Sequence, residues 1–84
     1  MEELARMLGA NFRKARCEKG LTQEEVAQKI GVSVELYSRM ERGTVLPSVE
    51  TFTTLYYVLD VPMEALIGSP DPRPKLRLIR GGLE

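Results

Sequence analysis

The stretch that decides the fold is Thr22-Gln23-Glu24-Glu25-Val26-Ala27-Gln28-Lys29-Ile30-Gly31-Val32-Ser33. Thr22 followed three residues later by Glu25 is the pattern of a capping box, in which two side chains satisfy backbone N–H groups at a helix N-terminus. The helix that begins here is expected to end at Gly31, because glycine enters the left-handed conformation freely. Ala27 is small where a second helix would have to cross closely. The stretch therefore predicts two short helices that meet at a sharp angle around a tight turn.

The second of these helices is expected over residues 34–42, with Ser33 as its N-cap and Gly43 as its stop. Tyr37 and Met40 are its predicted inner positions, and they anchor it against the rest of the protein. The opposite side of the helix then faces outward and carries Val34, Glu35, Ser38 and Arg39. A helix presented in this way has the shape that enters a major groove of DNA.

Helical periodicity extends on both sides of this pair and predicts three further helices. One is expected from about Glu3 to Lys19, with an inner face of Leu4, Leu8, Phe12 and Ala15. Another follows the cap Ser48, with an apolar face of Val49, Phe52, Leu55, Tyr56 and Leu59. A short fifth helix over 63–67 is entered through Pro62. The predicted fold is all-α: a compact five-helix domain over residues 1–68 with a helix-turn-helix, followed by a Pro-rich, basic C-terminal tail over 69–84.

Composition excludes several classes of site. The 84 residues include no histidine and a single cysteine, Cys17. An intrachain disulfide, a structural zinc site and the usual catalytic triads are therefore not expected, and we predict no catalytic residue, no metal and no cofactor. Cys17 is expected to be a small, partly buried filler. No apolar run approaches the ~20 residues that cross a bilayer, and the N-terminus lacks a signal-peptide pattern, so a cytoplasmic protein is expected.

Charge is distributed unevenly although the formal net charge is zero. Residues 44–69 contain no Lys or Arg and three acidic residues, whereas 70–84 contain four basic and two acidic residues. Contacts to DNA phosphates would therefore have to come from elsewhere than the acidic second half of the domain. We expect modest affinity from one copy and a need for dimerisation.

The quoted stretch, together with Ser38-Arg39-Met40-Glu41-Arg42-Gly43 and Pro47-Ser48, resembles the phage-repressor/Cro-type helix-turn-helix family of small XRE-like transcription regulators. The resemblance covers about residues 8–68, and several fixed spacings agree at once. It implies a homodimer that binds palindromic operators in double-stranded DNA and regulates transcription, as a repressor or autoregulator.

The resemblance also implies roles for individual residues. The positions that match base-reading residues are Val34, Glu35 and Arg39. Those that match DNA-backbone contacts are Gln23, Ser33, Ser38, Arg42 and Thr44. Arg16 and Glu41 match a structural ion pair. The sequence departs from the family at Tyr37, where a branched aliphatic residue is usual, and at Asp60, where glycine is usual.

Some of these roles have alternatives. Glu35 either accepts a hydrogen bond from a cytosine amino group or is a solvated residue that favours the helix dipole. Arg39 is suited to guanine or to phosphate, and Val34 either meets a thymine methyl group or only lines the surface. Of the adjacent Tyr56 and Tyr57 one is expected in the core, and the other, Tyr57, at a dimer seam.

The tail and the overall function also have alternatives. The tail could be a basic arm on DNA that uses Arg73, Lys75, Arg77 and Arg80. It could instead be a clip on a partner chain that uses Leu76, Leu78 and Ile79. A disordered end is the third interpretation. A different class of function is a protein-interaction module, or the antitoxin of a toxin–antitoxin pair, built on the same fold. Its protein partner would bind through residues 69–84.

Overall fold

The structure is a computed structural model that describes residues 2–68, and these residues form five helices and no strand. The helices are α1 (Glu2–Glu18), α2 (Gln23–Ile30), α3 (Val34–Arg42), α4 (Val49–Leu59) and α5 (Met63–Ile67). The predicted all-α fold is confirmed, and its helices begin and end within about a residue of the predicted positions. The tail over 69–84 lies outside the described residues, so its division from the domain and its alternative roles stay predictions.

Local capping explains where the central helices begin and end. The backbone N–H of Glu25 donates to Thr22 Oγ1 at 3.0 Å, and that of Thr22 donates to Glu25 Oε1 at 2.8 Å, which completes the capping box. Ser33 caps α3 by accepting from the N–H of Leu36 at 3.1 Å. Gly31 follows α2 with φ of 78°, a left-handed conformation that lets the chain turn at once into α3.

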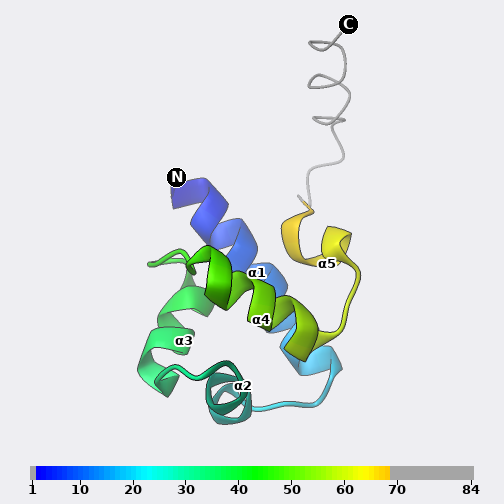
Figure 1. Cartoon of the computed structure of the whole chain (residues 1–84). Coiled ribbons are helices and arrows are strands. Elements are labelled where there is room, and N and C mark those ends of the chain that lie inside the picture. Colours follow the sequence, from blue (N-terminus) through cyan, green and yellow to red (C-terminus); the bar gives the residue numbers. More distant parts are fainter. Residues whose placement is uncertain (1, 69–84) are drawn as a thin grey trace, which may run out of the picture.

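The core lies where α1 and α4 pack over the helix pair α2 and α3, with α5 closing it beside α1 (Figure 1). Its largest fully buried side chains are Tyr37, Phe12, Leu55, Leu59, Leu66 and Val26. The rings of Phe12 and Phe52 lie 6.0 Å apart and join α1 to α4. Tyr37, the aromatic departure from the family pattern, is completely buried, so the larger side chain fills the core rather than displacing α3 to the surface.

Three expectations about burial were wrong. Leu4 is 40% exposed and Val49 is 83% exposed, because each lies in the first turn of its helix, beyond the area that the neighbouring helices cover. The buried stripe of α1 begins at Ala5 instead. Cys17 is exposed rather than a partly buried filler.

A close approach between α1 and α3 depends on Gly9, a residue for which the sequence suggested no role. A Cβ atom at this position would lie less than 3.0 Å from the carbonyl oxygens of Met40 and Glu41. Since these are backbone atoms, they cannot turn aside as a side chain could. Gly9 therefore sets the distance at which α1 crosses the C-terminal end of α3.

Candidate nucleic-acid interface

The outer side of α3 is held at the surface by the burial of its inner side. Tyr37 and Met40 lie in the core, whereas Glu35 and Arg39 are exposed and Val34 is 38% exposed. The structure thus brings the three predicted base-reading residues together on one exposed helix face. Figure 1 shows α3 at the edge of the molecule, beside α2.

The predicted backbone-contact residues stand around this helix. Arg42 and Thr44 are exposed at its C-terminal end, and Thr44 Oγ1 donates to the carbonyl oxygen of Arg39 at 3.2 Å. Ser33 stands at the other end of α3, where its hydroxyl is occupied as the N-cap. Ser38 is half-buried on α3, which leaves only part of its side chain accessible. Ser33, Arg42 and Thr44 therefore border the outward face at its two ends, and Ser38 lies midway along the helix.

Gln23, the fifth of these residues, is already engaged within the protein. Its amide Nε2 donates to Glu41 Oε1 at 2.9 Å, which links the first residue of α2 to the end of α3. The side chain is half-buried at the N-terminus of α2. A phosphate contact by Gln23 would therefore come from a side chain whose orientation Glu41 holds.

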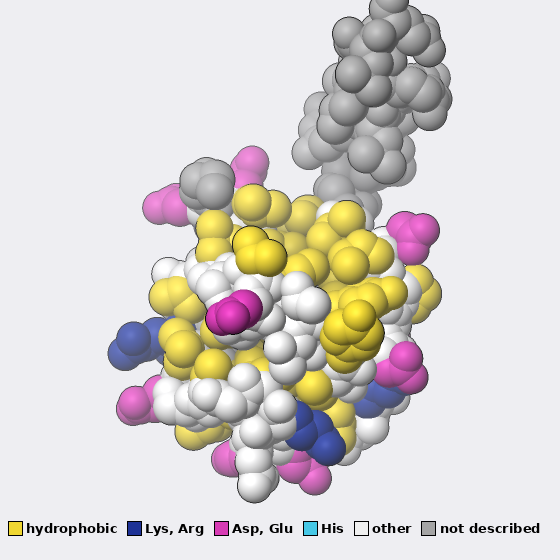
Figure 2. Space-filling view, in the orientation of Figure 1, with side chains coloured by type: hydrophobic (Ala, Val, Ile, Leu, Met, Phe, Trp, Pro, Cys, Tyr) yellow, Lys and Arg dark blue, Asp and Glu magenta, His cyan; other side chains and the backbone are white. Residues whose placement is uncertain are grey.

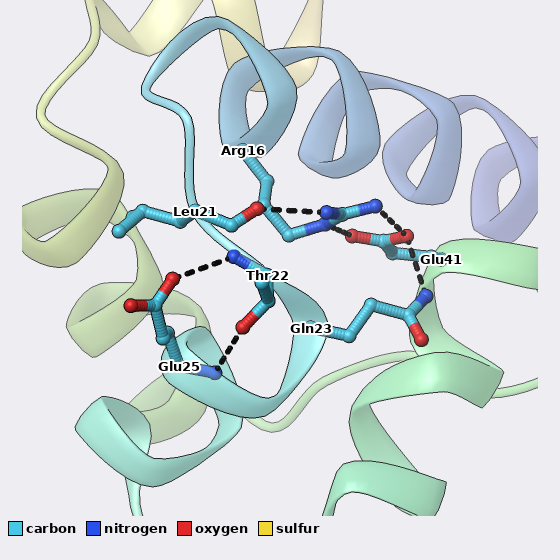
Figure 3. Close-up of polar contacts among 6 residues, drawn as sticks. All are labelled: Arg16, Leu21, Thr22, Gln23, Glu25 and Glu41. Carbon is cyan, nitrogen blue, oxygen red and sulfur yellow. Dashed lines mark hydrogen bonds and ion pairs between the residues drawn. The ribbon is translucent and has the colours of Figure 1, made fainter.

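Arg16 and Glu41 form an ion pair beneath this junction (Figure 3). Arg16 Nε donates to Glu41 Oε2 at 2.6 Å, and Arg16 Nη2 donates to Glu41 Oε1 at 3.2 Å. The guanidinium also donates through Nη1 to the carbonyl oxygen of Leu21 at 2.9 Å. The Arg16 side chain is 13% exposed and that of Glu41 is 3% exposed. The pair thus ties α1, the entry to α2 and the end of α3 into one unit.

The environment of the pair shifts its protonation equilibria. Burial raises the pKa of Glu41, but the hydrogen bonds to the carboxylate, led by those from Arg16, outweigh burial and hold the pKa below its usual value. The hydrogen bond to Glu41 raises the pKa of Arg16. Burial raises the pKa of the nearby Tyr37 hydroxyl well above its usual range. All three groups therefore keep their ordinary charges at neutral pH.

Two residues of α1 that make long-range contacts, Gly9 and Asn11, were not predicted from the sequence. Gly9 allows α1 to approach α3, and Asn11 Nδ2 donates to the carbonyl oxygens of Leu66 and Gly68 at 2.7 and 3.0 Å. The partners of Asn11 lie 55 and 57 residues along the chain, so no local pattern announces them. An isolated Gly and Asn within a predicted helix were the only available signals, since both residues are poor helix formers.

Comparison with known proteins gives one consistent result. The profile of the helix-turn-helix family matches residues 12–66. The chain is 39% identical to an uncharacterized HTH-type transcriptional regulator of Sinorhizobium fredii, y4dJ, over 86% of this chain and 94% of that protein. It is 34% identical to the cryptic phage CTXphi transcriptional repressor RstR of Vibrio cholerae, over 87% of this chain and 71% of that protein. The clp gene regulator ClgR of Corynebacterium glutamicum has a similar structure, with a TM-score of 0.72, 28% identity, and coverage of 95% of this chain and 85% of that one.

Proposed function

The chain belongs to the helix-turn-helix family, and from this premise we propose that it recognises a palindromic operator as a cytoplasmic homodimer, as a repressor or autoregulator of transcription. Membership makes it a DNA-binding transcription regulator and not an enzyme. No helix within residues 2–68 is long and apolar enough to cross a membrane. The palindromic operator, the homodimer and the DNA-reading residues are the parts of this proposal that go beyond family membership.

The observation that carries the proposal is the exposed face of α3, which presents Val34, Glu35 and Arg39 side by side on a helix anchored by buried residues. In a major groove Arg39 would donate to guanine O6 and N7, Glu35 would accept from a cytosine amino group, and Val34 would meet a thymine methyl group. Phosphate contacts would come from the bordering set of Gln23, Ser33, Ser38, Arg42 and Thr44.

Homodimerisation is proposed because one domain this small covers too few base pairs for tight, specific binding. Two copies would place their α3 helices in successive major grooves, about one helical turn of DNA apart. Tyr57 is 74% exposed on α4, on the side of that helix away from the core, and it is our candidate for the dimer seam. Its ring lies 5.5 Å from that of Tyr56, which supports it in this outward position.

The experiment is a titration of the full chain against DNA from its own upstream region, with random DNA as competitor, at ~150 mM salt. We expect a sequence-specific complex with a two-fold symmetric footprint. Arg39→Ala should weaken binding by about 1–3 kcal/mol and relax the preference at one base of each half-site. Arg13→Ala, at an exposed position on α1, is the matched control and should bind as the parent does. An unchanged footprint and affinity in Arg39→Ala would remove Arg39 from the reading face.

A second candidate is a regulator that also serves a protein partner, as an antitoxin does. The acidic balance of residues 44–68, which contain no Lys or Arg, favours it. Purification from the native host followed by mass spectrometry would test it: a stoichiometric partner that alters operator affinity would support this candidate, and its absence would leave the homodimer acting alone.

A further inference from the structure

An apolar groove lies on the side of the molecule where the N-terminal end of α1, the start of α4 and the end of α5 converge. Its volume is about 300 Å³, and its lining includes Leu4, Leu8, Leu46, Val49, Phe52 and Ile67. Figure 2 shows this face as the broad yellow area that extends across the upper part of the domain. None of the proposed DNA contacts lines the groove.

The groove is unusual because much of its lining is open to solvent. Leu46 is 39% exposed, Ile67 is 50% exposed and Val49 is 83% exposed. A group of large apolar side chains gathered on one face is typical of a surface that another segment or molecule covers. The misjudged inner positions Leu4 and Val49 both belong to it, so their apolar character is explained by this surface rather than by the core.

Acidic residues are the sequence neighbours of two residues that line the groove. Glu3 and Glu50 are exposed and directly adjoin the lining residues Leu4 and Val49 in sequence. Arg6, the basic residue nearest to Leu4 in sequence, pairs with Glu2 at 3.7 Å. An occupant that combines apolar and basic side chains would therefore suit this face.

The tail of the chain has this combination and starts beside the groove. Lys75-Leu76-Arg77-Leu78-Ile79-Arg80 interleaves apolar with basic residues. Ile67 forms part of the groove wall, and Asn11 holds the carbonyl oxygen of Gly68 at 3.0 Å, which fixes the point where the tail leaves the domain. Residues 69–74 can span at most about 20 Å, a reach well beyond the dimensions of a 300 Å³ groove.

We propose that residues 75–80 occupy the apolar groove of their own chain, with Leu76, Leu78 and Ile79 against the apolar lining and Arg77 and Arg80 toward the exposed Glu3 and Glu50. The same chain is the favoured source because a short tether raises the effective concentration of the segment to about the millimolar range. Basic side chains held there are withdrawn from DNA. The proposal therefore assigns the tail an intramolecular role and does not depend on the proposed operator or dimer.

The test places a spin label on Gly82→Cys in the full chain, just beyond the proposed segment, with Cys17→Ser removing the exposed native thiol. Methyl resonances of Leu4, Leu46 and Val49 are then recorded by NMR. We expect these resonances to be broadened strongly. The methyl resonances of Val26, a buried residue of α2, should keep most of their intensity. No broadening at the groove, or equal broadening over the whole domain, would overturn the proposal.

Three further measurements test whether the broadening is specific to the groove and to the same chain. Val49→Lys should abolish the broadening at Leu4 and Leu46, whereas Thr53→Lys, exposed one turn further along α4 and outside the groove lining, should leave it unchanged. Circular dichroism of both variants checks that the fold is intact. Mixing spin-labelled chains with isotope-labelled chains that carry no spin label separates the sources of the segment: broadening in the mixture would mean that a second copy supplies it, and would overturn the intramolecular assignment.

Discussion

Glu41 is buried at the C-terminal end of α3. Its carboxylate is neutralised by an arginine of α1 and receives a further hydrogen bond from α2. Arg16 reaches it from α1 with two hydrogen bonds, and Gln23 reaches it from α2 with one. Breaking such a pair from one side leaves a buried charge without compensation, which costs more than the intact pair contributes. Arg16 and Glu41 are therefore more important for the orientation of α2 and α3 than their distance from the outer face of α3 suggests.

Replacing Arg16 by Met should lower the free energy of unfolding by about 3–5 kcal/mol, because Glu41 would remain buried and unpaired. Urea unfolding followed by circular dichroism measures this value. Arg13→Met on the exposed side of the same helix is the control, and it should change the stability by less than about 0.5 kcal/mol. A loss in Arg16→Met no larger than that of the control would show that the pair is not the junction we describe.

The pH dependence of stability should carry the signature of Glu41. Its pKa in the folded protein lies below the ordinary value of 4.5, so between the two values the unfolded chain binds a proton that the folded chain does not. The stabilising contribution is therefore complete above pH 4.5 and is lost as the pH falls through the pKa of the folded state. The parent should therefore lose its advantage in unfolding free energy over Glu41→Gln as the pH falls from 4.5 through the pKa of the folded state. The loss should be at most about 1.4 kcal/mol per pH unit. A difference that stays constant with pH would contradict the lowered pKa.

The helices show how a local preference and a packing requirement can oppose each other. Glycine is a poor helix former, yet Gly9 lies in the middle of α1 because α3 passes too close for a Cβ atom. Asp60 presents the reverse case, since it ends α4 with φ of 52°, a left-handed conformation that glycine adopts more readily. At Gly9 the packing of α1 against α3 prevails over helix propensity, and at Asp60 a residue with a strained backbone conformation is tolerated.

Gly9→Ala should destabilise the protein although alanine favours helix. The added methyl group meets the carbonyl oxygens of Met40 and Glu41 and forces α1 and α3 apart, at a cost of about 1–3 kcal/mol that exceeds the gain in helix propensity of about 1 kcal/mol. Thermal and urea unfolding measure the net loss. Ala10→Gly at the next, exposed position isolates the propensity term, and it should cost about 0.5–1 kcal/mol. A more stable Gly9→Ala variant would show that the two helices have room to spare.

Asp60→Gly should act in the opposite direction and raise the unfolding free energy by about 0.5–1 kcal/mol, because it removes the left-handed strain of a residue with a Cβ atom. The ion pair that it removes, Lys19 to Asp60 at 3.8 Å, joins two exposed side chains and offsets little of this gain. Asp60→Ala is the control, since it loses the same ion pair but keeps the strain, and it should be less stable than the parent. Equal stabilities of the Gly and Ala variants would show that the conformation at this position is not strained.

Most of the fold at this scale could be predicted because its signals are local. The caps Thr22 and Ser33 and the stop Gly31 act within a turn of themselves, so their residue types predict the helix ends directly. The exposure of Leu4 and Val49 could not be predicted. An apolar stripe shows which side of a helix is apolar, but it does not show how far the neighbouring helices extend over it. The contacts of Gly9 and Asn11 depend on the partner brought against α1 in three dimensions.

At the scale of the whole molecule, a net charge of zero leaves recognition to the placement of a few charges. Arg39 and Arg42 lie in the last turn of α3, while α4 and α5 carry acidic residues and no basic ones. We expect the two arginines to act in different ways. Arg39 should read bases from the outer face of α3, and Arg42 should contact the DNA backbone at the end of the helix. The residues that read DNA could be proposed from the sequence because they follow from the resemblance, whereas the spacing between two reading helices depends on how two copies assemble.

This difference leads to a test of recognition and assembly together. Arg42→Gln should weaken binding to all DNA sequences alike and should reduce the slope of log affinity against log salt by about 0.9 for each phosphate contact that is lost. A homodimer loses the contact twice, so the slope should change by about 1.8, whereas a monomer would show half of this change. Arg39→Ala is the counterpart, and it should alter the sequence preference more than the salt dependence. A slope change near 0.9 would contradict the homodimer, and an unchanged slope would remove Arg42 from the phosphate-binding set.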